Sequence, residues 1–99
     1  MAHDPASLEY LRRAILALDT ELVALLNRRA ALSRAVGDCK RAGGQSIYRP
    51  DRETALMRQL ETMCGESLPI EHLQAIYREI LSSSRALQQP ERVAPAENK

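Results

Sequence analysis

Apolar residues recur every three or four positions over the first third of the chain, which is the spacing of one face of an α-helix. The series consists of Leu8, Leu11, Ile15, Leu18, Leu22, Leu25, Leu32 and Val36. Neither glycine nor proline interrupts it before Gly37. We therefore predict one long helix here. A glycine inside a helix costs about 1 kcal/mol relative to alanine, so Gly37 marks a candidate close approach by a neighbouring backbone or a ligand.

The ends of this helix carry local signals. Asp4-Pro5 supplies a capping residue followed by a proline, and Ser7 is an alternative cap. The pair Gly43-Gly44 is typical of a helix end, so the helix should run to about Ala42.

Two shorter helices are predicted beyond the loop GGQSIYRP. The first starts at Pro50 or Asp51 and stops near Gly65. The second follows the start signal Ser67-Leu68-Pro69 and stops at Pro90. The stripe of the first consists of Glu53, Leu56, Leu60 and Met63, and that of the second consists of Ile70, Leu73, Ile76 or Tyr77, Ile80, Ser84 and Leu87.

These elements predict an all-α fold in which residues 7–89 form one helical domain. Residues 1–6 form an N-terminal extension, and residues 90–99, with two prolines and few apolar side chains, should be disordered. A helix of about 36 residues is ~54 Å long, whereas a compact chain of this size has a radius of gyration of about 13 Å. The shorter helices can cover only part of its apolar face. We therefore expect a second copy of the chain to cover the rest, in a homodimer.

Composition narrows the function. Hydrophobic residues make up 44% and charged residues 27% of the 99 positions, as in ordinary globular proteins. With no Trp or Phe, three Tyr and a net charge of +1, the chain lacks the stacking surface and basic excess of nucleic-acid binders. It has no apolar run long enough to span a membrane and no recognisable signal peptide. We expect a cytoplasmic protein without nucleic-acid or membrane partners.

The metal-ligand residue types are scattered. Cys39 and Cys64 match no metal or redox spacing, and we expect free thiols in a reducing compartment. His3 and His72 have no neighbours at ligand spacing. We therefore expect no metal site and no cofactor.

Polar side chains interrupt the apolar stripes, beginning with Arg29, which stands where the first stripe calls for leucine. The others are Arg12 and Lys40 on or beside the same stripe, Arg52 and Glu53 at the start of the second, and Ser84 and Gln88 on the third. Each has an ordinary explanation when taken alone. A lone arginine can extend its head group to water, a serine can bond its own helix, and an exposed Arg52–Glu53 pair would contribute little.

The set as a whole indicates a site. Four cations and one acid lie on or beside inward stripes, and buried charge without a partner costs several kcal/mol. A bound dianion would supply the missing negative charge. Because the planar guanidinium group donates two parallel hydrogen bonds to a carboxylate, the pattern favours a helical pocket for a small dicarboxylate.

No nucleophile with a paired base is visible, and Glu53 is the remaining general-base candidate. A reaction without a covalent step or a proton transfer fits best. Such a site would hold one substrate conformation and place charge where the transition state develops it.

Four segments in order and spacing resemble the all-helical chorismate mutase family. They are LR..I..LD..L..LL..R from Leu11 to Arg29, VG..K from Val36 to Lys40, IY.P.RE from Ile47 to Glu53, and REI.S.S..LQ from Arg78 to Gln88. The resemblance covers roughly residues 7–89. It implies an intertwined homodimer of three-helix subunits that converts chorismate to prephenate by a one-step Claisen rearrangement, without a cofactor.

The resemblance also implies roles for individual residues. Arg29 should bind one substrate carboxylate, and Arg12 should reach from the other subunit to bind a carboxylate too. Lys40 and Gln88 should donate to the ether oxygen, which gains negative charge as the C–O bond breaks. Glu53 should accept a hydrogen bond from the substrate hydroxyl.

Further residues would complete the pocket. Arg52 and Ser84 should finish its polar lining, and Val36 and Leu81 should form apolar walls. Many relatives have Asp where this chain has Arg49, and arginine cannot accept a hydrogen bond, so Arg49 receives no role. Gln88 replaces a glutamate found in some relatives and can donate at any pH.

Two other functions are compatible with the same fold. One is isochorismate pyruvate-lyase, against which Glu53 argues, because an apolar residue stands there in such enzymes. The other is a non-catalytic regulatory or dimerisation module of an aromatic-pathway enzyme, against which the full set of cations argues. The sequence leaves open whether the chain acts alone or as a domain of a bifunctional protein.

Overall fold

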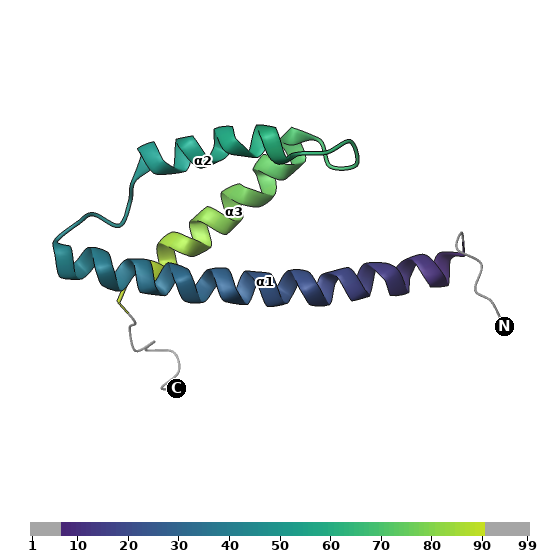
Figure 1. Ribbon diagram of the computed structural model, residues 1–99, viewed down its shortest axis with the longest axis horizontal. Coiled ribbons are helices and arrows are strands. Elements are labelled where there is room, and N and C mark those ends of the chain that lie inside the picture. Colours follow the sequence, from purple (N-terminus) through teal and green to yellow (C-terminus); the bar gives the residue numbers. More distant parts are fainter. Residues whose placement is uncertain (1–6, 91–99) are drawn as a thin grey trace, which may run out of the picture. The chain divides into compact units, whose positions relative to one another are not determined.

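The computed structural model describes residues 7–90, which form three α-helices and no strand (Figure 1). The helices are α1 (Leu8–Gly43), α2 (Pro50–Met63) and α3 (Ile70–Gln88). The prediction of one long helix followed by two shorter ones is confirmed. The predicted N-terminal extension, the start signal at Asp4-Pro5 and all of the predicted disordered tail except Pro90 lie outside the described residues.

The first helix begins and ends where local chemistry dictates. The Ser7 hydroxyl accepts a hydrogen bond from the Tyr10 amide at 3.1 Å, which satisfies one of the free N–H groups of the first turn. At the other end Gly44 has a φ of +71°, and the amides of Gly44 and Gln45 donate to the Arg41 and Lys40 carbonyls. This pair of hydrogen bonds defines a Schellman turn. Glycine adopts the left-handed backbone conformation of this turn without strain because it has no Cβ.

The chain divides into two compact units, Met1–Ala31 and Leu32–Lys99, and α1 contributes to both. In the first unit the apolar face of α1 is exposed. Leu8, Ile15 and Leu18 are 61%, 57% and 63% exposed, and Leu22 and Leu25 are more than half exposed. A continuous apolar row of this length is typical of a surface that another chain covers.

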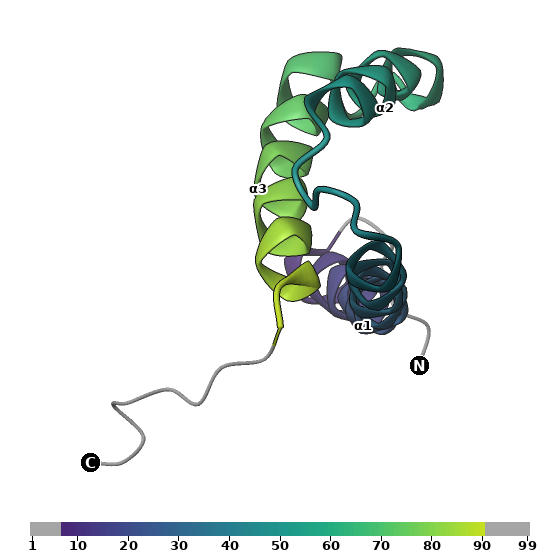
Figure 2. The same cartoon turned by 90° about the vertical axis from the view of Figure 1, so that its left-hand side faces the viewer.

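The second unit contains α2, α3 and the last turns of α1. Helices α2 and α3 pack together, and α3 runs from the end of α2 to the C-terminal part of α1 (Figures 1 and 2). Leu60 of α2 and Leu81 of α3 are its buried apolar residues, at 1% and 9% exposure. Pro50 occupies the first turn of α2, where its missing N–H removes no helical hydrogen bond.

Met63, the last residue of the predicted stripe of α2, is 61% exposed. It is the last residue of the helix, and the chain turns into the loop before α3 directly after it, so burial ends one turn earlier at Leu60. In α3, Tyr77 is half-buried and Ile76 is exposed, which decides between these two candidates for the stripe.

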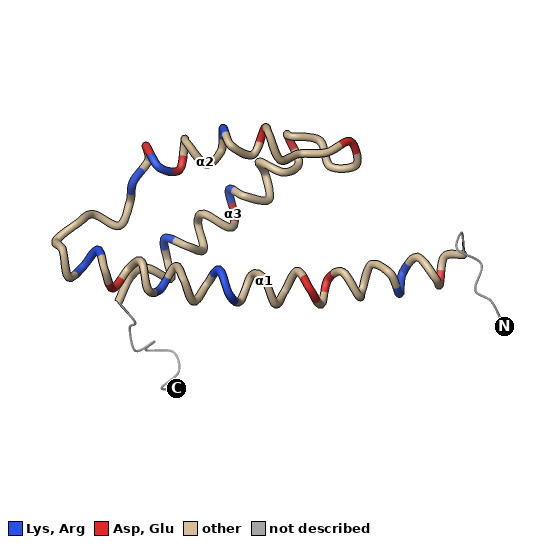
Figure 3. The backbone as a smooth tube through the Cα atoms, viewed as in Figure 1, with Lys and Arg blue, Asp and Glu red and all other residues tan. Residues whose placement is uncertain are grey.

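Charged residues of both signs are distributed along the three helices (Figure 3). At the start of α2 the signs alternate closely through Asp51, Arg52 and Glu53. None of the described helices combines the length and apolarity that a membrane crossing requires.

Candidate active site

The last turns of α1 meet the end of α3 through small and polar residues. Gly37 is buried, and a Cβ at this position would overlap the backbone of Gln88, including its carbonyl oxygen. One turn earlier the buried hydroxyls of Ser33 and Ser84 hydrogen-bond at 3.0 Å. The predicted close approach at Gly37 is therefore made by the backbone of α3.

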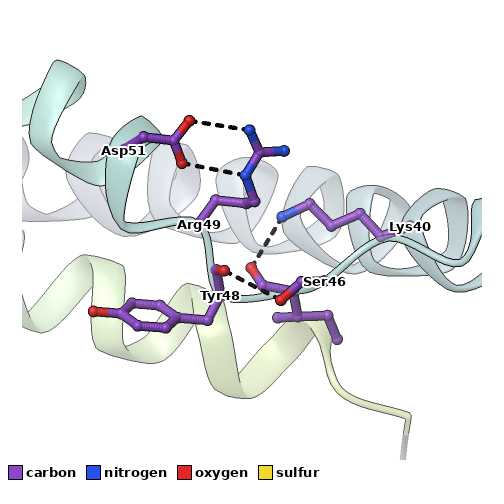
Figure 4. Close-up of polar contacts among 6 residues, drawn as sticks. Lys40, Ser46, Tyr48, Arg49 and Asp51 are labelled. Carbon is purple, nitrogen blue, oxygen red and sulfur yellow. Dashed lines mark hydrogen bonds and ion pairs between the residues drawn. The ribbon is translucent and has the colours of Figure 1, made fainter.

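This close approach brings Lys40 to Gln88. The Lys40 ammonium donates to the Gln88 side-chain oxygen Oε1 at 3.2 Å. It also donates to the Ile47 carbonyl oxygen at 3.0 Å, and Figure 4 draws this second contact. Both acceptors are neutral, and in the described part of the chain Lys40 has no carboxylate partner. The site therefore keeps its positive charge. Because Oε1 faces Lys40, the amide nitrogen of Gln88 remains available as a donor.

The backbone of Gln88 is also fixed. Arg41 donates to the Gln88 carbonyl oxygen and forms an ion pair with Asp38 one turn earlier. Arg41 thus connects the end of α3 to α1 next to Lys40. Side chain and backbone of Gln88 are both held by consecutive residues of α1.

Glu53 lies beside an arginine that the sequence did not single out. Its carboxylate accepts a hydrogen bond from Arg85 of α3 at 2.6 Å, and the guanidinium carbon of Arg85 lies 5.5 Å from the Tyr48 ring centroid. The hydrogen bond to Glu53 raises the pKa of Arg85. Tyr48, Glu53, Leu81 and Arg85 line an open pocket of about 420 Å³ together with residues of α2 and Arg78.

Arg49 makes a local contact. Its Nε and Nη2 atoms donate to the two carboxylate oxygens of Asp51 at 3.2 and 3.0 Å (Figure 4). This pair lowers the pKa of Asp51, chiefly through the hydrogen bond from Arg49. The Tyr48 ring and the Arg49 side chain extend to different sides of the loop (Figure 4).

The remaining predicted residues lie at several places. Val36 is 43% exposed on α1, and Arg52 is exposed in the first turn of α2. In the first unit, Arg29 is half-buried, and the exposed Arg12 borders an open depression with Leu8 and Leu16. The second unit thus brings Lys40 to Gln88, and places Glu53 and Leu81 on one pocket.

Sequence reasoning missed four residues of this region, namely Ser33, Arg41, Tyr48 and Arg85. Arg85 carried a usable signal, because it lies four residues after Leu81 and three before Gln88 and so shares their face of α3. Ser33 carried a weaker one, four residues before Gly37 on α1. Nothing in the spacing of Tyr48 indicated a contact with an arginine.

Comparison with known families decides the relationship. The model of the family described as "Chorismate mutase type II" matches residues 11–89. The chain belongs to the chorismate mutase type II family. This confirms the resemblance found in the four sequence segments, and the match lies within the predicted domain of residues 7–89.

Several curated relatives of this chorismate mutase type II chain are named "Bifunctional chorismate mutase/prephenate dehydratase". The protein of Neisseria gonorrhoeae is 36% identical over 83 residues, which is 84% of this chain and 22% of that protein. That of Aquifex aeolicus is 34% identical over 91 residues, 88% of this chain and 25% of its own length. That of Pseudomonas aeruginosa is 33% identical over 99 residues, which is 92% of this chain and 26% of that protein. The chain spans about a quarter of the length of these relatives.

Proposed function

We propose that the chain catalyses the Claisen rearrangement of chorismate to prephenate in phenylalanine and tyrosine biosynthesis. The family and the names of the relatives support this activity. The structural observation that carries it is the meeting of the Lys40 ammonium with the Gln88 amide where α1 contacts α3. Lys40 and Gln88 are two neighbouring donors, and no carboxylate of the described chain neutralises Lys40. They therefore suit a substrate oxygen that becomes negative during the reaction.

The reaction needs such donors at one atom. In the rearrangement the ether C–O bond breaks as a new C–C bond forms, and negative charge develops on the ether oxygen. Lys40 uses two of its three N–H groups on protein acceptors and has one left for this oxygen. The amide nitrogen of Gln88 donates from the other side. Donors that are already fixed before the reaction stabilise the transition state without further reorganisation.

The carboxylates of the substrate require further cations. In our proposal Arg29 binds one carboxylate and Arg12 of the partner subunit binds a carboxylate too. Glu53 accepts the hydrogen bond of the substrate hydroxyl. Arg52 and Ser84 complete the polar lining, and Val36 and Leu81 are the apolar walls. These bonds would hold the flexible enolpyruvyl ether in the folded conformation that the rearrangement requires.

The active form in this proposal is an intertwined homodimer in the cytoplasm. The exposed leucine row of α1 supports it, because a second copy of the chain has a complementary apolar surface of the same length. Arg12 lies on this part of α1. Each active site would then contain residues of both subunits, and a monomer would be inactive.

The test is a spectrophotometric assay of the purified chain with chorismate, which follows the loss of the diene absorbance. Acid conversion of the product to phenylpyruvate identifies prephenate, and light scattering reports the mass of the active species. Turnover by a dimer is the expected result. A folded dimer without turnover would overturn the proposal, and isochorismate would then be tested as the substrate of a lyase.

A further inference from the structure

We propose that Arg85 is a positioning residue for Glu53. It holds one oxygen of the Glu53 carboxylate so that the other oxygen faces the substrate hydroxyl. This inference rests on the proposed function, because it concerns how the site presents its hydrogen-bond acceptor. The pair joins residues 32 positions apart on α2 and α3.

The contact restricts a side chain that would otherwise be free to rotate. Arg85 Nη1 lies 2.6 Å from Glu53 Oε1, a short charge-assisted hydrogen bond. The side chains are 36% and 24% exposed, so the pair is partly shielded from water. Glu53 is in the first turn of α2, where its own helix leaves its carboxylate without an anchor among the described hydrogen bonds.

The arginine is itself held from a second direction. Its guanidinium carbon lies 5.5 Å from the centroid of Tyr48, a distance typical of a cation–π contact. Tyr48 belongs to the loop that also carries the Ile47 carbonyl bound by Lys40. Loop, α2 and α3 therefore fix the guanidinium group together, and its direction determines where Oε1 lies.

The use of one oxygen leaves the other available. A carboxylate has two oxygens with about four acceptor positions, and the described contact with Arg85 uses Oε1. Arginine remains charged at every relevant pH, so the carboxylate always has a cation beside it. Glu53 is then an acceptor with a fixed direction, as a hydroxyl group of a bound dicarboxylate requires.

The test is a double-mutant cycle in the full chain with chorismate as substrate. Arg85→Met should lower kcat by about 10- to 100-fold, because a misplaced catalytic group costs that much, and KM should stay within about twofold. In a Glu53→Ala background the same change should have no further effect on kcat. Arg85→Lys keeps the charge and should recover part of the rate. Arg58→Met, an exposed charge removal on α2, is the matched control and should keep the wild-type rate.

The outcomes separate the two proposals. Wild-type turnover is measured first, and its absence overturns the proposed function and this inference with it. If the wild type is active but the effects of the two substitutions on kcat are additive in the double variant, the positioning role of Arg85 is overturned and the proposed function stands. An increase in KM at constant kcat does the same, because it would make Arg85 a direct ligand of the substrate. Circular dichroism verifies that each variant is folded. If Arg85→Met does not fold, the cycle is measured with Arg85→Lys instead.

Discussion

The backbone of Gln88 lies so close to Gly37 that a Cβ on residue 37 would be 2.7 Å from the Gln88 Cα atom. The last turn of α3 can occupy its position only because α1 has no side chain there. The hydrogen bond between Lys40 and Gln88, one turn further along α1, depends on the same approach. Glycine is the smallest residue and the only one that permits it.

Gly37→Ala should therefore impair both stability and catalysis. Overpacking a fixed contact costs about 1–3 kcal/mol. Alanine stabilises a helix by about 1 kcal/mol relative to glycine, so the upper part of the overpacking range exceeds this gain. Separation of Lys40 from Gln88 should lower kcat/KM by about tenfold or more. Urea unfolding and steady-state kinetics measure the two effects.

Gly65→Ala is the matched control for this variant. A Cβ at Gly65 meets no atom of the described chain within 4 Å, and its φ is not positive. Its stability and rate should match those of the wild type. Equal behaviour of the two variants would contradict the importance of the contact at Gly37.

Arg29→Ala should lower turnover by at least ~10²-fold if Arg29 stabilises substrate charge in the transition state. The dimer should remain folded, because Arg29 is only half-buried. Arg12→Ala should have a similar effect on turnover. Each single variant is assayed at saturating chorismate, with light scattering as the check on assembly.

A mixture of Arg12→Ala and Arg29→Ala chains tests whether sites are shared between subunits. Mixed dimers contain one site with both arginines intact if Arg12 acts across the interface, so part of the activity should return after the chains are unfolded and refolded together. Mixed dimers as inactive as either parent would show that Arg12 acts within its own subunit.

The rate should change little between mildly acidic and mildly alkaline pH. The amide of Gln88 donates in any protonation state, whereas Gln88→Glu must be protonated to donate. Lys40 beside it would lower the pKa of the introduced carboxyl group, so this variant should lose activity as pH rises towards neutrality. The pH profiles of kcat for the two folded proteins provide the comparison, and a sharp alkaline loss in the wild type would contradict it.

Arg49→Gln should raise the pKa of Asp51. Arg49 holds this pKa below its ordinary value through a hydrogen bond and its charge, and glutamine retains no charge. Because the folded pKa is depressed, the stabilisation by the pair is present above the ordinary aspartate pKa and is lost as pH falls through the folded value. Carboxyl NMR titration of both proteins measures the shift, and Asp38→Asn is a control that should leave Asp51 unchanged.

The sequence predicted those features that depend on nearby residues. The three helices, the Ser7 cap and the stop at Gly43-Gly44 follow from periodicity and from glycine, proline and serine signals within a few positions. The Arg85–Glu53 pair did not follow, because its members lie on two helices whose relative register is set by packing around Leu60 and Leu81. The same holds for Ser33 and Ser84. The roles of Arg12 and Arg29 came from family resemblance and stay predictions.

Lys40 forms two hydrogen bonds with the segment that follows α1. Its carbonyl oxygen accepts from Gln45 in the turn that ends α1, and its ammonium group donates to Ile47 two residues later. The first part of the connection to α2 is therefore anchored at two positions, Gln45 and Ile47, to a single residue. Surface loops ordinarily tolerate added residues at little thermodynamic cost, but an insertion between Gln45 and Ile47 would shift the ammonium group itself. Length variation among natural homologues should accordingly spare this short segment and accumulate in the connection between α2 and α3.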